Sequence, residues 1–194
     1  MSNIVLHHGR VNLKDRQAIL KQTPKTIWLT GLSASGKSTL AFALEDALTK
    51  LGQLCYVLDG DNIRHGLNKN LTFSHEDRTE NIRRIAEVAK LMNDAGLIVI
   101  TAFISPYRED REMAKSIIGE SFFKEVYVST SIEVCETRDP KGLYKKARSG
   151  AIHDFTGIGS PYEAPLKPTL MIDTSTRSLE ECTKNLVDMA LDRL

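Results

Sequence analysis

The stretch GLSASGKS, from Gly31 to Ser38, matches the pattern G-x-x-x-x-G-K-[ST]. It directly follows the apolar run TIWLT, Thr26 to Thr30, which favours a β-strand. The residues after it, Leu40 to Leu51, show apolar helical spacing and stop before Gly52. A strand, a glycine-rich loop and a helix in this order predict a phosphate-binding loop, and the expected ligand is a nucleoside triphosphate.

The residue types in this loop suit that ligand. Glycines let the backbone N–H groups point inward around an anion, and the helix N-terminus adds positive potential. We expect Lys37 to reach the β- and γ-phosphates and Ser38 to offer its hydroxyl to Mg²⁺. The alternative is a chance Gly/Ser-rich turn between a strand and a helix. The residues predicted to bind ATP are Gly31, Leu32, Ser33, Ala34, Ser35, Gly36, Lys37, Ser38, Thr39 and, further along, Arg138.

Apolar runs alternate with helical patterns along the rest of the chain. The other four candidate strands are Leu54 to Leu58, Leu97 to Phe103, Val126 to Ser129 and Leu170 to Ile172. Five strands separated by helices predict an α/β fold, a five-stranded parallel sheet with helices on both faces. With 194 residues, 41% of them hydrophobic, the chain suits one domain spanning 1–194.

Two helices have clear start signals. One follows Ser74, with Asp77 completing a capping-box pattern, and the other follows Ser178, with Glu181 in the same role. The predicted buried positions of the two helices are Ile82, Ile85, Ala86, Ala89 and Met92 in the first, and Leu179, Cys182, Leu186, Met189 and Ala190 in the second.

Composition excludes several classes of protein. The net charge of +1 argues against a strongly basic nucleic-acid binder, so we expect no nucleic-acid partner. Three scattered cysteines, Cys55, Cys135 and Cys182, fit neither a disulfide framework nor a zinc site and favour a reducing cytoplasm. The amino-terminal residues MSNIVLHHGRVNLKDRQ have no signal-peptide pattern, and no run of about 18 apolar residues predicts a membrane span.

Phosphate-binding loops occur in GTPases, motors and small-molecule kinases. In the stretch from Asn68 to Leu71, Leu71 stands where a guanine-binding N-K-x-D motif needs aspartate. Asp139 to Gly142 matches D-x-x-G but follows a helical stretch rather than a strand. A motor would need coupling domains, for which this length leaves no room. A small kinase remains, with a second-substrate pocket and a basic lid.

The second candidate strand ends in two carboxylates, Asp59 and Asp61, at the edge where open α/β sheets bind ligands. We favour Asp61 as the catalytic base or as a group that orders the Mg²⁺ shell, while either residue could instead cap a short helix starting near Asn62. Arg78 and Asn81 share one side of their helix and suit an anion and a purine edge, or form a solvated face.

The segment 138–168 is too long for an ordinary connection and predicts a lid. Its five cations, which could neutralise polyphosphate, are Arg138, Lys141, Lys145, Lys146 and Arg148. Phe73 and Phe155 stand in polar loops and could either stack on a base or anchor those loops.

Four long matches carry a family resemblance: GLSASGKST, LDGDNIRHGLNKNLTFSHEDRTENIRRIAEVAKLM, ITAFISPYREDRE and CETRDPKGLYKKARSGAIHDFTGIGSPYEAP. Over residues 25–173 the chain resembles the adenylylsulfate kinases. The resemblance implies transfer of the ATP γ-phosphoryl group to the 3′-hydroxyl of adenosine 5′-phosphosulfate, a step in sulfate activation. It places substrate binding on Asp59, Asp61, Asn62, Ile63, Arg64, Phe73, Arg78, Asn81, Ile104, Ser105, Lys141, Leu143, Phe155, Thr156 and Gly157. The two phenylalanines would then sandwich the adenine.

In this family the serine of F-I-S-P, here Ser105, is described as a phosphoserine intermediate. We expect direct in-line transfer instead, because that reaction needs positioning and charge stabilisation rather than a covalent relay. Ala34 and His75 depart from the family's glycine and proline, and we expect the loop to hold Ala34 in an ordinary backbone conformation.

The resemblance also implies a homodimer and association with ATP sulfurylase. Two alternatives stay open at this point: a kinase for another small hydroxyl substrate, such as a nucleoside monophosphate or a sugar acid, and a non-catalytic nucleotide-binding regulator.

Overall fold

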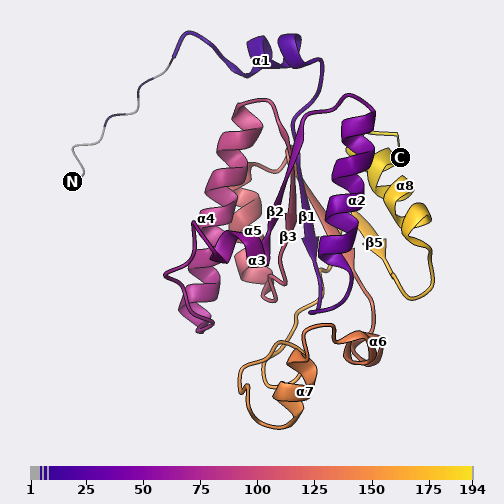
Figure 1. Cartoon of the computed structure of the whole chain (residues 1–194). Coiled ribbons are helices and arrows are strands. Elements are labelled where there is room, and N and C mark those ends of the chain that lie inside the picture. Colours follow the sequence, from indigo (N-terminus) through magenta and orange to yellow (C-terminus); the bar gives the residue numbers. More distant parts are fainter. Residues whose placement is uncertain (1–4, 6, 8, 194) are drawn as a thin grey trace.

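Five parallel strands form the central sheet of the computed structural model, which describes residues 5, 7 and 9–193 (Figure 1). The other amino-terminal positions, within the stretch where the sequence predicts no signal peptide, and residue 194 lie outside the described residues. The strands are β1 (Thr26–Thr30), β2 (Cys55–Asp59), β3 (Ile98–Ala102), β4 (Phe123–Val128) and β5 (Leu170–Ile172). Their order is β2-β3-β1-β4-β5, with every pairing parallel, which confirms the predicted fold class.

The predicted strand ends differ most at β4, which begins at Phe123 rather than Val126. Lys124 and Glu125 interrupt the apolar run, yet both pair with β1, at Ile27 and Trp28. Charged residues are accommodated here because β4 is not buried along its whole length.

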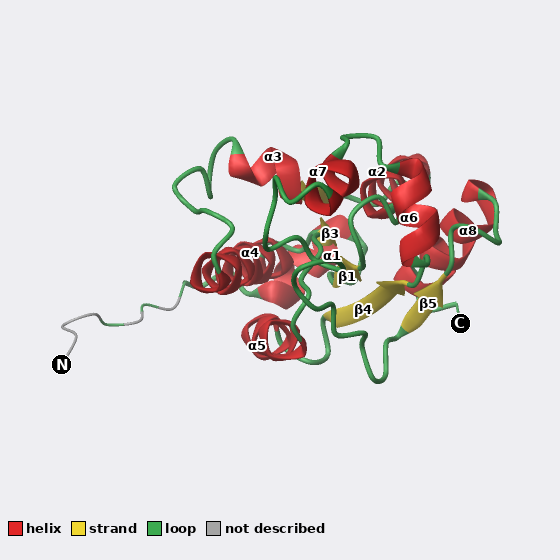
Figure 2. Ribbon diagram, turned by 90° about the horizontal axis from the view of Figure 1, so that it is seen from below, coloured by secondary structure: helices red, strands yellow, loops and turns green. Residues whose placement is uncertain are grey.

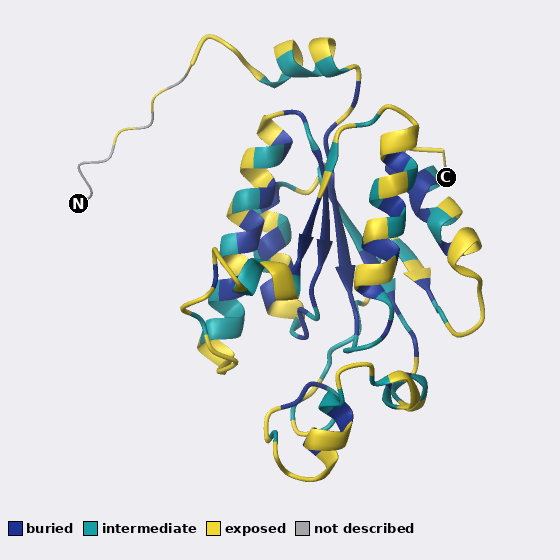
Figure 3. Cartoon of the chain, in the orientation of Figure 1, coloured by how far each residue is buried: buried dark blue, intermediate teal, exposed yellow. Residues whose placement is uncertain are grey.

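Helices cover both faces of the sheet (Figures 1 and 3). Ile27 and Leu29 of β1 pack with α2 and α8 on one face, whereas Trp28 packs with α4 and α5 on the other, as strand alternation requires. The helices are α1 (Leu13–Leu20), α2 (Lys37–Lys50), α3 (Gly60–Arg64), α4 (His75–Asp94), α5 (Arg108–Ile118), α6 (Ile132–Arg138), α7 (Leu143–Arg148) and α8 (Leu179–Ala190). None of the helices among the described residues is both long enough and apolar enough to cross a membrane.

The two predicted helix starts turn out differently. Ser178 and Glu181 form the full reciprocal capping box of α8. At α4, Ser74 accepts from the Asp77 N–H, but the Asp77 carboxylate bonds to Thr72 instead of returning to Ser74, so the capping-box prediction there is half wrong. Leu179, expected in the core, is 48% exposed because it is the first residue of α8.

The carboxyl ends of the strands meet at one edge, which Figure 2 views from below. The phosphate-loop sequence leaves β1 there, α3 follows β2 directly, and the loop Phe103–Tyr107 follows β3. The segment 138–168, predicted to be an irregular lid, contains α7 and lies beyond this edge (Figure 1).

Candidate active site

The phosphate-loop sequence joins β1 to α2, as the sequence predicts. A Cβ atom at Gly31 would lie 2.5 Å from the Val128 carbonyl oxygen, so only glycine fits there. Gly36 is the N-cap of α2 with φ +102°, a backbone conformation that L side chains rarely adopt. The helix starts at Lys37 rather than at Leu40, since the polar residues Lys37, Ser38 and Thr39 carry no apolar signal.

The expectation for Ala34 is wrong. Its φ is +59°, in the left-handed region. The loop is held by hydrogen bonds on either side of this residue: Ser35 N–H donates to the Leu32 carbonyl at 3.2 Å, and Tyr144 donates to the Ser33 carbonyl at 3.0 Å. These bonds impose a conformation that alanine would not choose.

Lys37 is buried against its own loop. Its Nζ donates to the Leu32 carbonyl at 2.6 Å and lies 3.5 Å from the Ser35 hydroxyl. Burial lowers the pKa of Lys37 from 10.5 to about 8, with the nearby Asp59 carboxylate acting in the opposite direction. Lys37 forms no ion pair with the residues that the structure describes, and a buried cation in this state is well suited to receive a phosphate.

Asp59 has two roles in the structure. Its Oδ1 accepts from the Asp61 and Asn62 N–H groups and caps α3, while its Oδ2 accepts a 2.6 Å hydrogen bond from the Ser38 hydroxyl. The Asp59 side chain is buried, with an exposed fraction of 6%. The sequence favoured Asp61 for the Mg²⁺ shell, but the structure places Asp59 beside Ser38, because the last residue of β2 faces α2.

Asp61 instead faces the lid. Its Oδ2 forms an ion pair with Lys141, and both side chains are more than half exposed. The lid cation therefore lies over the carboxylate of α3 from 80 residues away in the sequence.

The sequence-predicted pocket residues meet between α3, α4 and the lid. The Arg64 guanidinium lies 4.3 Å over the Phe73 ring, which is 67% exposed. Arg78 donates to the Phe73 carbonyl at 2.8 Å, to Thr156 Oγ1 at 2.8 Å and to the Asp154 carbonyl at 2.6 Å. Arg78 is thus not part of a merely solvated face; it ties α4 to the lid.

Asn81 is 5% exposed, and its Oδ1 accepts from Asn68 at 2.9 Å. Asn62 and Ile63 lie on α3, where Ile63 packs toward the core beside α4. The structure therefore brings Arg64, Phe73 and Arg78 together, while the Asn81 carbonyl oxygen is already engaged.

The lid residues Tyr144, Ala147 and Phe155 form a small buried core with Cys135 of α6. Leu143 of the lid and Leu32 and Ala34 of the phosphate loop pack against this core. Phe155 is 8% exposed and meets the Tyr144 ring edge-on at 4.9 Å. Of the two possibilities for Phe155, loop anchoring is the one observed, and a sandwich with the exposed Phe73 would require the lid to rearrange. Gly157 closes a turn by donating to the Ser160 carbonyl at 2.7 Å.

The amino-terminal end of the lid, at Arg138, is anchored near the phosphate loop. Arg138 donates to Thr174 Oγ1 at 2.7 Å and to the Thr174 carbonyl at 2.9 Å. The Thr174 hydroxyl lies 2.9 Å from the Ser35 carbonyl. Arg138 is therefore exposed beside the loop, and its role in binding ATP stays a prediction.

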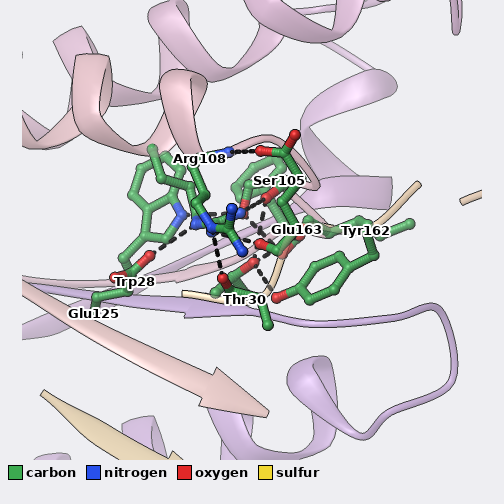
Figure 4. Close-up of polar contacts among 11 residues, drawn as sticks. Trp28, Thr30, Ser105, Arg108, Glu125, Tyr162 and Glu163 are labelled. Carbon is green, nitrogen blue, oxygen red and sulfur yellow. Dashed lines mark hydrogen bonds and ion pairs between the residues drawn. The ribbon is translucent and has the colours of Figure 1, made fainter. Parts of the chain in front are cut away.

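Ser105 is 2% exposed and has φ +38°. Its hydroxyl oxygen accepts from Trp28 Nε1 at 3.1 Å (Figure 4). The preceding Ile104 carbonyl accepts from the Thr30 hydroxyl at 2.7 Å. The Ser105 hydroxyl is thus engaged with the core side of β1.

Three polar residues near this loop were missed by the sequence reasoning: Arg111, Glu125 and Tyr162, of which Figure 4 labels Glu125 and Tyr162. Arg111 is buried on α5 and pairs with Glu125 Oε1 at 2.7 Å, and Tyr162 lies 2.9 Å from the Thr30 hydroxyl. Arg111 at helical spacing from the apolar residues Ala114 and Ile118 of α5 was an available signal.

Comparisons with known proteins point to one family. Residues 23–173 match the family model described as adenylylsulphate kinase. An adenylyl-sulfate kinase of Oceanobacillus iheyensis is 55% identical over 192 residues, covering 99% of this chain and 96% of that protein. One from Vibrio cholerae is 53% identical over 191 residues, covering 98% and 89%.

Solved structures show the same fold. The structure described as Mycobacterium tuberculosis APS kinase CysC in complex with AMPPNP and APS has a TM-score of 0.83 and 47% identity, covering 87% of this chain and 98% of that one. A gluconokinase from Sinorhizobium meliloti, 19% identical with a TM-score of 0.58 over 89% and 94% of the two chains, shares the fold alone. A family match across most of the chain, together with relatives above half identity, places this protein in the adenylylsulphate kinase family.

Proposed function

We propose that the chain transfers the γ-phosphoryl group of ATP to the 3′-hydroxyl of adenosine 5′-phosphosulfate, giving 3′-phosphoadenosine 5′-phosphosulfate and ADP. The observation that carries the proposal is that one lid contacts both halves of the site. Tyr144 of the lid bonds to the phosphate loop at Ser33, while Asp61 and Arg78 of the acceptor pocket bond to lid residues. A donor and an acceptor bound in these two places would meet under the lid, where water is excluded.

The donor half comprises the phosphate loop and Arg138. Triphosphate oxygens would replace the Leu32 carbonyl as the partner of Lys37, and their negative charge would raise the lowered pKa of this lysine again. A fixed ammonium group there stabilises charge on the transferred phosphoryl group.

Mg²⁺ fits the residues at the start of α2. The Ser38 hydroxyl and the buried Asp59 carboxylate supply oxygen donors, which this ion prefers. Within the part of the chain that the structure describes, no three His, Cys, Asp or Glu residues form a metal cluster, so phosphate oxygens and water would complete the shell. When bound, Mg²⁺ would neutralise charge between the β- and γ-phosphates. Ser38 would bind it directly, and Asp59 would orient the Ser38 hydroxyl.

The acceptor half comprises α3, the start of α4 and the lid. Asp61 would accept the proton of the attacking 3′-hydroxyl or orient that hydroxyl, and Lys141 would balance the charge. Arg64 and Arg78 provide planar donors for the phosphosulfate. Phe73 has a free face for the adenine, whereas Phe155 supports the lid from inside.

The site needs no phosphoserine. Ser105 is buried and its hydroxyl is bonded to Trp28, so direct transfer between two bound nucleotides is the simpler route.

The proposal extends to the setting of the enzyme. We infer a single kinase domain that works as a homodimer in the cytoplasm and associates with ATP sulfurylase. The three cysteines form no disulfide, and Cys135 and Cys182 are buried, which suits a reducing compartment. Gel filtration of the purified chain, alone and mixed with the sulfurylase, tests both assemblies.

A coupled ADP-release assay tests the function. The acceptors are adenylylsulfate, AMP, shikimate and gluconate, with product identity read by mass spectrometry and Lys37→Ala as the inactive control. We expect adenylylsulfate to be phosphorylated far faster than the others. AMP isolates the contribution of the sulfate group. A higher kcat/KM for any of the other acceptors would overturn the proposal.

A further inference from the structure

A buried polar cluster joins Tyr162 and Glu163 of the lid to Thr30 and Ser105 at the edge of the sheet (Figure 4). Arg111 is 3% exposed, and its guanidinium donates three 2.7 Å hydrogen bonds to three separate segments. The acceptors are Glu125 Oε1 on β4, the Ser105 carbonyl after β3 and the Glu163 carbonyl. Glu163 ends the segment Asp154 to Glu163, which we call the returning limb of the lid. Charge-assisted bonds of this kind, buried and fully used, fix the segments that they join.

Tyr162 supplies a second connection from the same limb. The Thr30 hydroxyl has one hydrogen, and the Ile104 carbonyl at 2.7 Å is only an acceptor. The Tyr162 hydroxyl, 2.9 Å from Thr30 Oγ1, must therefore be the donor. The resulting chain runs from Tyr162 through Thr30 to Ile104, and Thr30 immediately precedes Gly31 of the phosphate loop.

The returning limb contacts the acceptor pocket through Arg78, whereas Lys141 contacts Asp61 from an earlier part of the lid. Arg78 bonds to Asp154 and Thr156, six to eight residues before Tyr162. The turn between Phe155 and Ser160 is closed by backbone bonds, so movement at Tyr162 is transmitted to Thr156. The amino-terminal end of the lid has a separate anchor, the hydrogen bond from Arg138 to Thr174.

We propose that Arg111 and Tyr162 are positioning residues for phosphoryl transfer, which fix the returning limb of the lid to the end of β1 and so set the position of the lid over the acceptor pocket. The proposal rests on the function proposed above. In this proposal each residue acts through the limb from Asp154 to Glu163 rather than by binding a substrate. Loosening this limb should weaken the acceptor contacts through Arg78 more than it disturbs the phosphate loop, which β1 and α2 hold on either side.

The test uses Tyr162→Phe, which keeps the ring and removes one hydroxyl, and Thr30→Val, which removes its partner. Thr26→Val is the matched control, since Thr26 is equally buried on β1 but bonds to Asn93 at the opposite end of the strand. Three quantities are measured for each variant: the melting temperature, the KM values for adenylylsulfate and ATP, and amide hydrogen exchange across residues 154–163.

We expect Tyr162→Phe to raise the KM for adenylylsulfate about fivefold, with the KM for ATP changed less than about twofold. Exchange should speed up in residues 154–163 and stay unchanged in α2. The double variant should show no more than the larger single effect, because both changes break one connection. Arg111→Met should raise the KM for adenylylsulfate and speed up exchange in residues 154–163 by more than Tyr162→Phe does.

Thr26→Val should lower the melting temperature without moving either KM or the exchange of the limb. If Tyr162→Phe, like Thr26→Val, lowers the melting temperature without changing the KM for adenylylsulfate, the cluster is merely structural and the proposal fails. Unchanged exchange in Tyr162→Phe also overturns it. Hydrogen exchange needs no substrate, so it decides the positioning role even if the wild-type chain fails to phosphorylate adenylylsulfate, a result that would overturn the proposed function alone.

Discussion

Trp28 Nε1 donates a 3.1 Å hydrogen bond to the hydroxyl oxygen of Ser105. Trp28 lies in the middle of β1, which pairs with β3, and Ser105 lies in the loop that follows β3. Ser105 is 2% exposed and its backbone lies in the left-handed region, with the Ser105 carbonyl held by Arg111. Presenting this hydroxyl to a γ-phosphate would require breaking the indole bond and rebuilding the loop, so the residue is better suited to holding the loop than to carrying phosphate.

Ser105→Ala should therefore keep a measurable rate. The variant leaves the buried Trp28 N–H without an acceptor, which should lower the free energy of unfolding by about 1–3 kcal/mol. Steady-state kinetics and a thermal melt measure the two effects, and wild-type protein given radiolabelled ATP alone should yield no acid-stable phosphoprotein. Stoichiometric labelling of Ser105 at a rate compatible with kcat would contradict direct transfer.

Lys37 should contribute to catalysis while reducing stability. Burial lowers its pKa to about 8, below its ordinary value of 10.5, so between these pH values the folded chain binds fewer protons than the unfolded chain. Stability from this group therefore rises with pH across that window, and the cost of the buried charge is fully present below pH 8.

Lys37→Met should melt above wild type at pH 7 without nucleotide, and the difference should shrink between pH 8 and 10.5. Lys37→Ala should retain the fold, and either variant should lose activity by about a thousandfold or more, as the β- and γ-phosphates lose their cation. Paired melts across pH measure the first effect, and near-normal kcat in either variant would refute the assigned role.

Asp59 and Asp61 should separate two functions. Asp59→Asn keeps the capping oxygen of α3 but removes the charge beside Ser38, so the Mg²⁺ concentration for half-maximal rate should rise about tenfold. Asp61→Asn should leave the Mg²⁺ requirement unchanged and lower kcat by about a hundredfold, far more than KM rises. Titrating MgCl₂ at saturating substrates distinguishes the variants, and the reverse pattern would exchange their roles.

Much of the fold, and the phosphate loop within it, could be predicted from local sequence. The strand-loop-helix around Gly31 is encoded by neighbouring residues, and the parallel sheet follows from alternating periodicity. The sequence favoured Asp61 over Asp59 for the Mg²⁺ shell, and it could not show that Asp59 is the residue beside Ser38, because this contact spans 21 positions of sequence. The sequence also left the role of Phe155 undecided between base stacking and loop anchoring, since its ring packs against Tyr144 of α7 only in the folded chain.

The backbone of Ala34 was predicted wrongly for a related reason. Local preference disfavours positive φ for alanine, yet contacts from Tyr144, more than 100 residues away, help hold the loop in that state. Tertiary contacts override intrinsic preference most often at functional loops.

Phe73 and Phe155 should respond differently to truncation. Phe73→Ala removes an exposed ring, so we expect the KM for adenylylsulfate to rise about tenfold with an unchanged melting temperature. Phe155→Ala opens a cavity in the lid core and should make the lid sensitive to limited proteolysis near α7 before the sheet unfolds. Protease resistance equal to wild type would contradict the anchoring role of Phe155.

Ala34→Gly should stabilise the protein. Alanine at φ +59° bears a left-handed strain of about 1–2 kcal/mol, which glycine relieves at an entropic cost of about 0.5–1 kcal/mol. The net gain should raise the melting temperature by about 1–3 °C in a chain of this size. Lys21→Gly, at the left-handed C-cap of α1 far from the site, should behave alike, whereas Ala47→Gly inside α2 should lower it. The kcat/KM for ATP in Ala34→Gly should stay within about twofold of wild type, because tertiary contacts already impose the conformation that glycine prefers. A lower melting temperature for Ala34→Gly together with a higher one for Lys21→Gly would show that the Ala34 methyl group stabilises the loop through packing.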